Sequence, residues 1–163
     1  MQMSVRASKI SLLIAEANPM GGQLITGALR RCRQYFDVVA SCSNSSEGIQ
    51  KLRELVPEVA LISVELRDGP LMGFKVLQEV RASQARTAAI MLMDFDERDL
   101  VVDAFREGAR GIFCRDRSFK TLSKCIRTVH SGQIWASNEE LEFLLDALRQ
   151  VRRLYLTAPG GAH

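Results

Sequence analysis

The stretch VALISVELRDGPLMGF, residues 59–74, passes from a continuous apolar run into a loop that carries charged residues, glycine and proline. Short runs of consecutive apolar residues are typical of strands buried on both faces, as in a parallel sheet. This run ends at Ser63. Reactive groups of α/β proteins gather at the carboxyl ends of such strands, so Ser63 and the loop after it form the first candidate site.

Four similar runs occupy residues 10–15, 36–42, 88–93 and 112–114, and segments with a helical period lie between them. Asn44 to Ser46 close the second run, and Ser45 or Ser46 is predicted to cap the helix that follows. Strands that alternate with helices require a parallel sheet covered on both faces. The predicted fold is therefore α/β: a doubly wound, five-stranded parallel sheet of flavodoxin-like topology with an extra C-terminal helix.

Bulk properties exclude several functional classes. The 163 residues are 47% hydrophobic, which fits one domain with an appendage. The net charge of +3 is dispersed and favours a solvated surface over a nucleic-acid interface. No apolar run approaches the roughly 18 to 20 residues that span a bilayer, so a cytoplasmic protein without a membrane partner is expected. The four cysteines show no CxxC spacing and are predicted to be small core residues.

The C-terminal segment has a different pattern. Ser137 and Glu140 are spaced as a capping box at the start of a helix. Apolar residues then recur at spacings of 3, 4, 3 and 4, the seam of a short coiled coil: Leu141, Leu144, Leu148, Val151 and Tyr155. Two interpretations stay open, a helix that packs on its own domain and a dimerisation helix. Residues 157–163, TAPGGAH, have the composition of a linker.

The order of these elements, together with four segments, resembles the receiver domain of two-component response regulators. The segments are LLIAEANPM, PEVALISVEL, DAFREGARGIFCRDRS and GQIWASNEELEFLLDAL. Among receivers the chain is most similar to those of the NarL/LuxR-type transcriptional regulators. The resemblance implies a receiver-like domain over residues 8–131, an extension helix over residues 132–156, and from residue 157 a linker to a DNA-binding domain outside this chain.

The resemblance also implies which positions matter. An active receiver transfers a phosphoryl group to an aspartate that ends the third strand, with two acids that hold Mg²⁺ and a hydroxyl and a lysine that bind phosphoryl oxygens. Carried over to this sequence, the two acids fall on Glu16 and Ala17, and the acceptor falls on Ser63. The hydroxyl falls on Met93, with Asp94 next to it. The lysine falls on Arg115, and the switch aromatic falls on Ile112. The resemblance therefore implies a degenerate pseudo-receiver: no catalytic residue, no Mg²⁺ cofactor and no phosphorylation on aspartate.

Two arrangements of the altered site are considered. Arg115 offers a planar fork that could pair with Glu16 in place of the lysine and the metal, and this ion pair is the preferred prediction. Alternatively, Glu65 and Asp68 could join Glu16 and Asp94 in an acidic cluster that binds a divalent ion. Phosphorylation rewired to Asp68 or Asp94 is the functional form of that alternative.

A different functional class, a flavodoxin-like binder of a small ligand, is disfavoured. The loop NPMGGQ lacks the Ser/Thr-rich cradle that holds a flavin phosphate, and no GxGxxG, Walker or nucleophile-elbow motif occurs, so the chain is not expected to be an enzyme. The expected partners are another protein or a second copy in a homodimer, with DNA contacted only by a C-terminal domain absent from this chain. A basic face is either solvated or used for a protein partner: Arg110, Arg115, Arg117, Lys120, Lys124 and Arg127.

Overall fold

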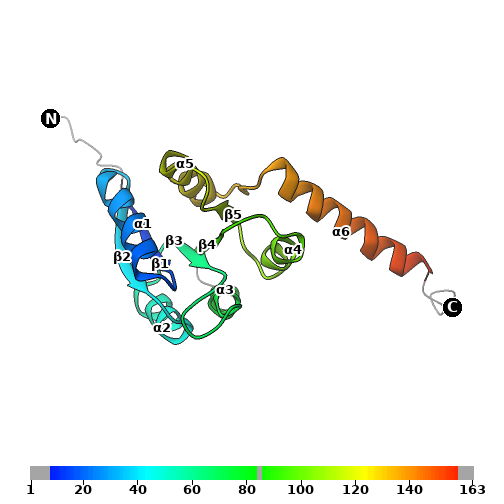
Figure 1. Ribbon diagram of the computed structural model, residues 1–163, viewed down its shortest axis with the longest axis horizontal. Helices are drawn as coiled ribbons and strands as arrows, with labels where there is room; N and C mark the ends of the chain where they lie inside the picture. Colours follow the sequence, from blue (N-terminus) through cyan, green and yellow to red (C-terminus); the bar gives the residue numbers. More distant parts are fainter. Residues whose placement is uncertain (1–7, 84–85, 158–163) are drawn as a thin grey trace.

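The computed structural model describes residues 8–83 and 86–157, with side chains up to residue 151. Five parallel strands form one sheet in the order β2-β1-β3-β4-β5. The strands are β1 (Ile10–Ala15), β2 (Phe36–Cys42), β3 (Val59–Ser63), β4 (Ala88–Met93) and β5 (Gly111–Cys114). The helices are α1 (Pro19–Arg31), α2 (Ser45–Leu55), α3 (Gly73–Ala82), α4 (Arg98–Arg106), α5 (Phe119–His130) and α6 (Asn138–Thr157). Figure 1 shows the helices around the sheet and confirms the predicted fold class.

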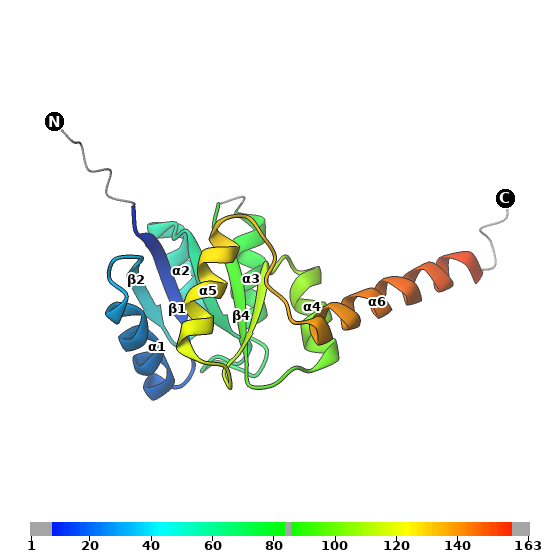
Figure 2. The same cartoon turned by 90° about the horizontal axis from the view of Figure 1, so that it is seen from above.

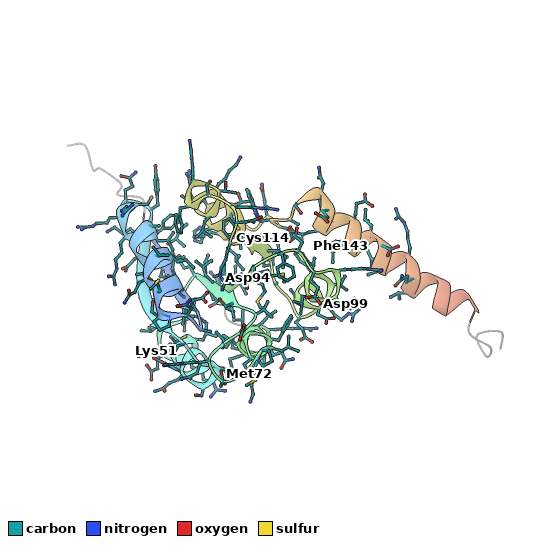
Figure 3. The ribbon with its side chains drawn as sticks, in the orientation of Figure 1. Lys51, Met72, Asp94, Asp99, Cys114 and Phe143 are labelled. Carbon is teal, nitrogen blue, oxygen red and sulfur yellow. The ribbon has the colours of Figure 1, made fainter. Side chains whose placement is uncertain are left out.

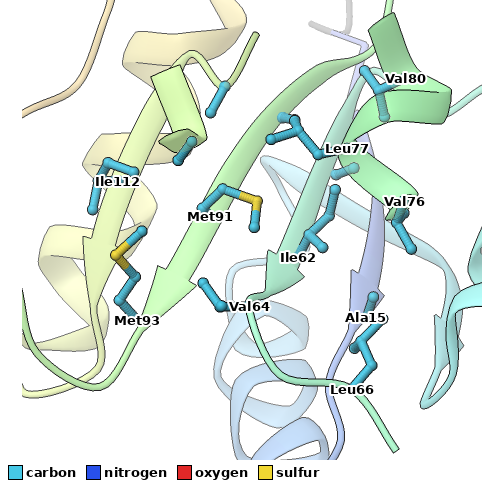
Figure 4. Close-up of a cluster of buried hydrophobic side chains, with 14 of the residues drawn as sticks. Ala15, Ile62, Val64, Leu66, Val76, Leu77, Val80, Met91, Met93 and Ile112 are labelled. Carbon is cyan, nitrogen blue, oxygen red and sulfur yellow. The ribbon is translucent and has the colours of Figure 1, made fainter. Parts of the chain in front are cut away.

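Two apolar clusters, one on each face of the sheet, hold the layers together. One cluster joins side chains of α2, α3 and α4 to the sheet, and the other joins α1 and α5 to the opposite face. Figure 4 shows part of the first cluster, where Leu77 of α3 lies near Ile62 and Met91 of the central strands. Residues of β3 are buried on both faces, which is why its sequence is apolar without alternation.

The register of the central strands brings the candidate positions to one edge. Ala15 of β1 pairs with Ile62 of β3, and Ser63 pairs with Leu92 of β4. Because the strands are parallel, the residues that follow β1, β3, β4 and β5 all emerge at the same edge of the sheet.

The cap of α2 differs from the sequence prediction. Asn44 is the N-cap, and its side-chain oxygen accepts a hydrogen bond from the Glu47 amide at 2.8 Å. Ser45 lies inside the helix, and its hydroxyl donates to Asp68 Oδ2 at 2.5 Å. Asn caps as well as serine does, and the long-range bond to Asp68 is not encoded in local sequence.

The last helix begins at the predicted capping box. Glu140 N–H donates to Ser137 Oγ at 3.1 Å, and the Ser137 hydroxyl donates back to Glu140 Oε2 at 2.6 Å. Near its start α6 packs on α4, with Phe143 against the core and an ion pair between Asp146 and Arg98. Farther along, α6 extends away from the sheet (Figures 1 and 2).

The coiled-coil seam is turned toward solvent rather than into the domain. Leu141 and Val151 are 40% and 56% exposed, Leu148 is 67% exposed, and Leu144 is half-buried. Most of the described seam is therefore exposed, but α6 packs on α4 and the core through Phe143 near its start, so both interpretations of this helix stay open. The Tyr155 side chain and residues 158–163 of the expected linker lie outside the described part, while Thr157 still belongs to α6.

The cysteines occur as free thiols. Cys42, Cys114 and Cys125 are buried and Cys32 is half-buried, as predicted for core residues. Among the helices that the structure describes, none is long and apolar enough to cross a bilayer.

Candidate functional site

Ser63 ends β3 beneath a tight reversal of the chain. Ser63 is 1% exposed, and Gly73, the first residue of α3, packs against its backbone carbonyl. A Cβ at Gly73 would be 1.9 Å from the Ser63 carbonyl oxygen, so only glycine fits there. The Gly73 amide donates to the Val64 carbonyl at 2.9 Å. Ser63 is thus held in a closed location where its hydroxyl meets only protein groups.

A three-residue network joins the ends of β1, β3 and β5. The Ser63 hydroxyl donates to Glu16 Oε2, and Arg115 Nη2 donates both to Ser63 Oγ and to the same Glu16 oxygen. Glu16 is 7% exposed, and its other oxygen accepts a bond from the Asn18 amide at 3.3 Å. The predicted ion pair between Arg115 and Glu16 is confirmed, and Ser63 is its third member.

Asp94 is a second carboxylate that binds Arg115, on the solvent-exposed side of the network. Asp94 comes directly after β4 (Figure 3). Arg115 Nη1 donates to Asp94 Oδ1 at 2.7 Å, and the Asp94 side chain is 72% exposed. Burial disfavours the charged guanidinium, but the carboxylates of Glu16 and Asp94 outweigh burial and raise the pKa of Arg115 above its ordinary value. The cation is therefore permanent, and one guanidinium fork pairs with two carboxylates, which leaves the three side chains with a net charge of −1.

The remaining carried-over positions have no polar side chain at this edge. Met93 is 3% exposed and Ile112 is fully buried, and both belong to the apolar cluster on the α3 and α4 face (Figure 4). Ala17, next to Glu16, has no side chain that could bind a metal or a phosphate. Chemically, the site holds one hydroxyl, one buried carboxylate and one guanidinium already bonded to one another.

The alternative acidic cluster does not assemble. Asp68 is turned to the start of α2, where it accepts bonds from the Ser45 amide at 3.1 Å and from the Ser45 hydroxyl. The hydroxyl bond is the main reason that the pKa of Asp68 is lowered. Glu65 is exposed beside the network. Within residues 8–83 and 86–151, no three His, Cys, Asp or Glu side chains converge as a metal site would require.

The loop between β3 and α3 is tied to the rest of the protein. Residues Leu66 and Gly69 exchange two backbone hydrogen bonds of 3.1 Å, and the Arg67 amide donates to the Ser43 carbonyl at 2.8 Å. Leu66 is 2% exposed and packs in the core. An open cavity of about 560 Å³ lies next to this loop, over the network, and Phe95, Glu97 and Arg115 are among its lining residues.

One buried carboxylate was not identified as a functional candidate from the sequence. Glu140 is fully buried, and its Oε1 has no hydrogen-bond partner among the residues that the structure describes. Desolvation raises its pKa, although Arg117 lies 3.8 Å away. Nearby, the Cys114 thiol donates to Asp96 at 2.8 Å, and burial raises the pKa of that thiol to about 12. The capping-box pattern predicted the bond between Glu140 and Ser137 but contains no signal for its burial.

Comparison with known proteins gives one clear family match. Residues 12–127 match the model of the response regulator receiver domain. The chain is 28% identical over 128 residues to the transcriptional regulatory protein LnrK of Bacillus subtilis, covering 78% of this chain and 57% of LnrK. It is 27% identical over 100 residues to the oxygen regulatory protein NreC of Staphylococcus aureus, covering 61% of this chain and 46% of NreC. The chain thus spans about half the length of these relatives.

Solved structures show the same fold. The signal receiver domain of NarL, a response regulator of Mycobacterium tuberculosis, superposes with a TM-score of 0.72 and 20% identity. The match covers 78% of this chain and all of that one. At this identity the similarity supports the fold alone.

Proposed function

Because the chain belongs to the response regulator receiver domain family, we propose that it is a signalling module whose state is set without phosphorylation of an aspartate. One observation carries this proposal. The residue at the acceptor position is Ser63, and its hydroxyl is already bonded to Glu16 and Arg115 in a closed network. A serine hydroxyl is a poor nucleophile unless a free base activates it, and the Glu16 carboxylate is neutralised by Arg115.

The residues at the edge of the sheet do not fit Mg²⁺. The ion prefers several hard oxygen ligands, of which carboxylates are the usual protein contribution. Glu16 is the one buried carboxylate in the network, and its Oε2 already accepts hydrogen bonds from Arg115 and Ser63. Because Arg115 supplies a permanent positive charge at this edge, the proposed state of the site does not depend on the binding of Mg²⁺ or of a phosphoryl group.

The proposed signalling output of the chain is self-association through α6. Support comes from the exposed seam of Leu141, Leu148 and Val151, which is apolar along a helix that extends from the domain. A homodimer would cover these side chains. The resemblance to NarL/LuxR-type regulators, together with the greater length of LnrK and NreC, supports the proposal that the chain is the receiver portion of a transcriptional regulator whose DNA-binding domain lies outside these 163 residues.

Acetyl phosphate with Mg²⁺ tests the phosphorylation proposal. The expected result is no acid-labile phosphoryl group on the protein, measured by intact mass spectrometry. A matched variant, Ala17→Asp/Ser63→Asp/Met93→Thr/Arg115→Lys, restores the residue types of an active receiver and should become labelled under the same conditions. Labelling of the unmodified chain that is lost in Asp94→Asn or Asp68→Asn would instead support rewired phosphorylation.

A further inference from the structure

The α6 helix has two functional sides. Side chains that face the domain are Glu140, which is buried, Phe143, which packs on the core, and Asp146, which pairs with Arg98. At roughly 100° per residue, Leu141 and Leu148 lie on the opposite side of the helix. Leu141 and Leu148 therefore point away from Phe143 and Asp146, whereas Leu144 and Val151 lie nearer the side of Glu140, and Leu144 is half-buried. A second helix can approach the side that carries Leu141 and Leu148 without meeting the domain.

The apolar side is wider than the seam of a minimal two-stranded coiled coil. Leu145 is 45% exposed and lies next to Leu141 and Leu148 on the same side. Charged side chains between a seam and solvent normally fix the relative direction of two coiled-coil helices. Positions 145 and 147, which flank the middle of the seam, carry none, and Glu140, which flanks its start, is buried. Charges distributed along the whole helix then favour one direction of pairing.

Acidic and basic residues lie in different halves of α6. Residues 138–147 contain four acids and no base, and residues 148–157 contain three arginines and no acid. Within the acidic half, Glu139 and Glu142 are exposed. Two parallel copies would set acidic half beside acidic half and basic half beside basic half. Two antiparallel copies would set opposite charges side by side and would also oppose the helix dipoles.

We infer that α6 pairs with α6 of a second copy in the antiparallel direction. This inference rests on the self-association proposed above and adds its geometry. A two-fold axis near Asp146 places Leu141 against Val151 of the partner subunit and Leu144 against Leu148 of the partner subunit. Asp146 itself points to Arg98 on the domain side, so the two copies of Asp146 do not meet in the seam. Chain segments that follow α6 would leave the dimer at opposite ends.

Disulfide trapping in the full 163-residue chain distinguishes the two directions. The background carries Cys32→Ser, because Cys32 is half-buried and the other three cysteines are buried. Leu141→Cys and Val151→Cys are prepared as separate proteins, one with a size tag, mixed, and oxidised. The antiparallel pair predicts a mixed 141–151 disulfide several-fold above either same-position disulfide. Gln150→Cys, exposed but off the seam, is the matched control and should stay unlinked.

Light scattering of the same samples separates the two possible failures. A dimer that forms only 141–141 and 151–151 disulfides is parallel, which overturns the inferred direction and leaves self-association intact. A monomer overturns both. A dimer that yields none of these disulfides, in which Leu148→Asp leaves the dimer unchanged, places the interface elsewhere and also overturns the inference.

Discussion

Removal of the Arg115 cation leaves Glu16 buried without its counter-charge, and the cost can be worked from the structure. Loss of one partner of a fully buried pair costs about 3–5 kcal/mol, whereas an exposed pair contributes about 0–1 kcal/mol. Glu16 is 7% exposed and the Arg115 side chain 30% exposed, so the pair lies between these limits. Arg115→Met should therefore lower the free energy of unfolding by about 2 kcal/mol, or the melting temperature by about 4–8 °C.

A double-mutant cycle isolates the pairwise part of that loss. Arg115→Met, Glu16→Gln and the double variant are unfolded in urea and followed by circular dichroism at 222 nm. Because Gln carries no charge, the double variant should lose much less than the sum of the single losses, with a coupling energy of about 1–2 kcal/mol. A second cycle with Arg53→Met and Glu79→Gln is the control: Arg53 Nε lies 2.7 Å from Glu79 Oε1, but the Arg53 side chain is 67% exposed, and a much smaller coupling energy is expected. Coupling no larger than that of the control would refute the buried ion pair.

Four further substitutions test the packing of two glycines, the cap of α2 and the buried acid. Gly73→Ala should cost about 3 kcal/mol of unfolding free energy because its Cβ would collide with the Ser63 carbonyl, whereas Gly27→Ala, which meets nothing within 4 Å, should stabilise α1 by about 0.5–1 kcal/mol. Asn44→Ala should cost about 1 kcal/mol by removing the cap of α2, as measured by thermal unfolding. Desolvation raises the pKa of Glu140 in the folded chain, so the folded state binds the extra proton and stability should fall as pH rises above 4.5; Glu140→Gln should flatten that slope in urea titrations.

The fold was predictable because its signal is local. The apolar run that ends at Ser63 and its four counterparts coincide with the strands of the sheet, and the parallel order follows from their alternation with helices. The ion pair of Arg115 with Glu16 could also be inferred, because parallel strands of known order bring their carboxyl ends together and a guanidinium is a natural partner for an isolated buried carboxylate.

Contacts that depend on long-range geometry were not predictable. The alternative acidic cluster included Asp68, but in the structure Asp68 binds Ser45, which lies more than twenty residues earlier in the chain. Ser63 was identified from the sequence only as the acceptor position at the end of its strand, and its bonds to Glu16 and Arg115 required the strand register. The periodicity of α6 identified its seam but could not tell which side faces the domain, which is decided by Phe143 and Asp146.

The most direct test of the central claim is a two-dimensional ¹H–¹⁵N NMR spectrum recorded with and without beryllofluoride and Mg²⁺. Beryllofluoride mimics a phosphoryl group on an aspartate, so a site closed by Ser63, Glu16 and Arg115 predicts superimposable spectra. The restored variant, Ala17→Asp/Ser63→Asp/Met93→Thr/Arg115→Lys, should shift under the same conditions and thereby validate the assay. Saturable, Mg²⁺-dependent shifts of the unmodified chain, centred on the residues after β3 and β4, would contradict the account.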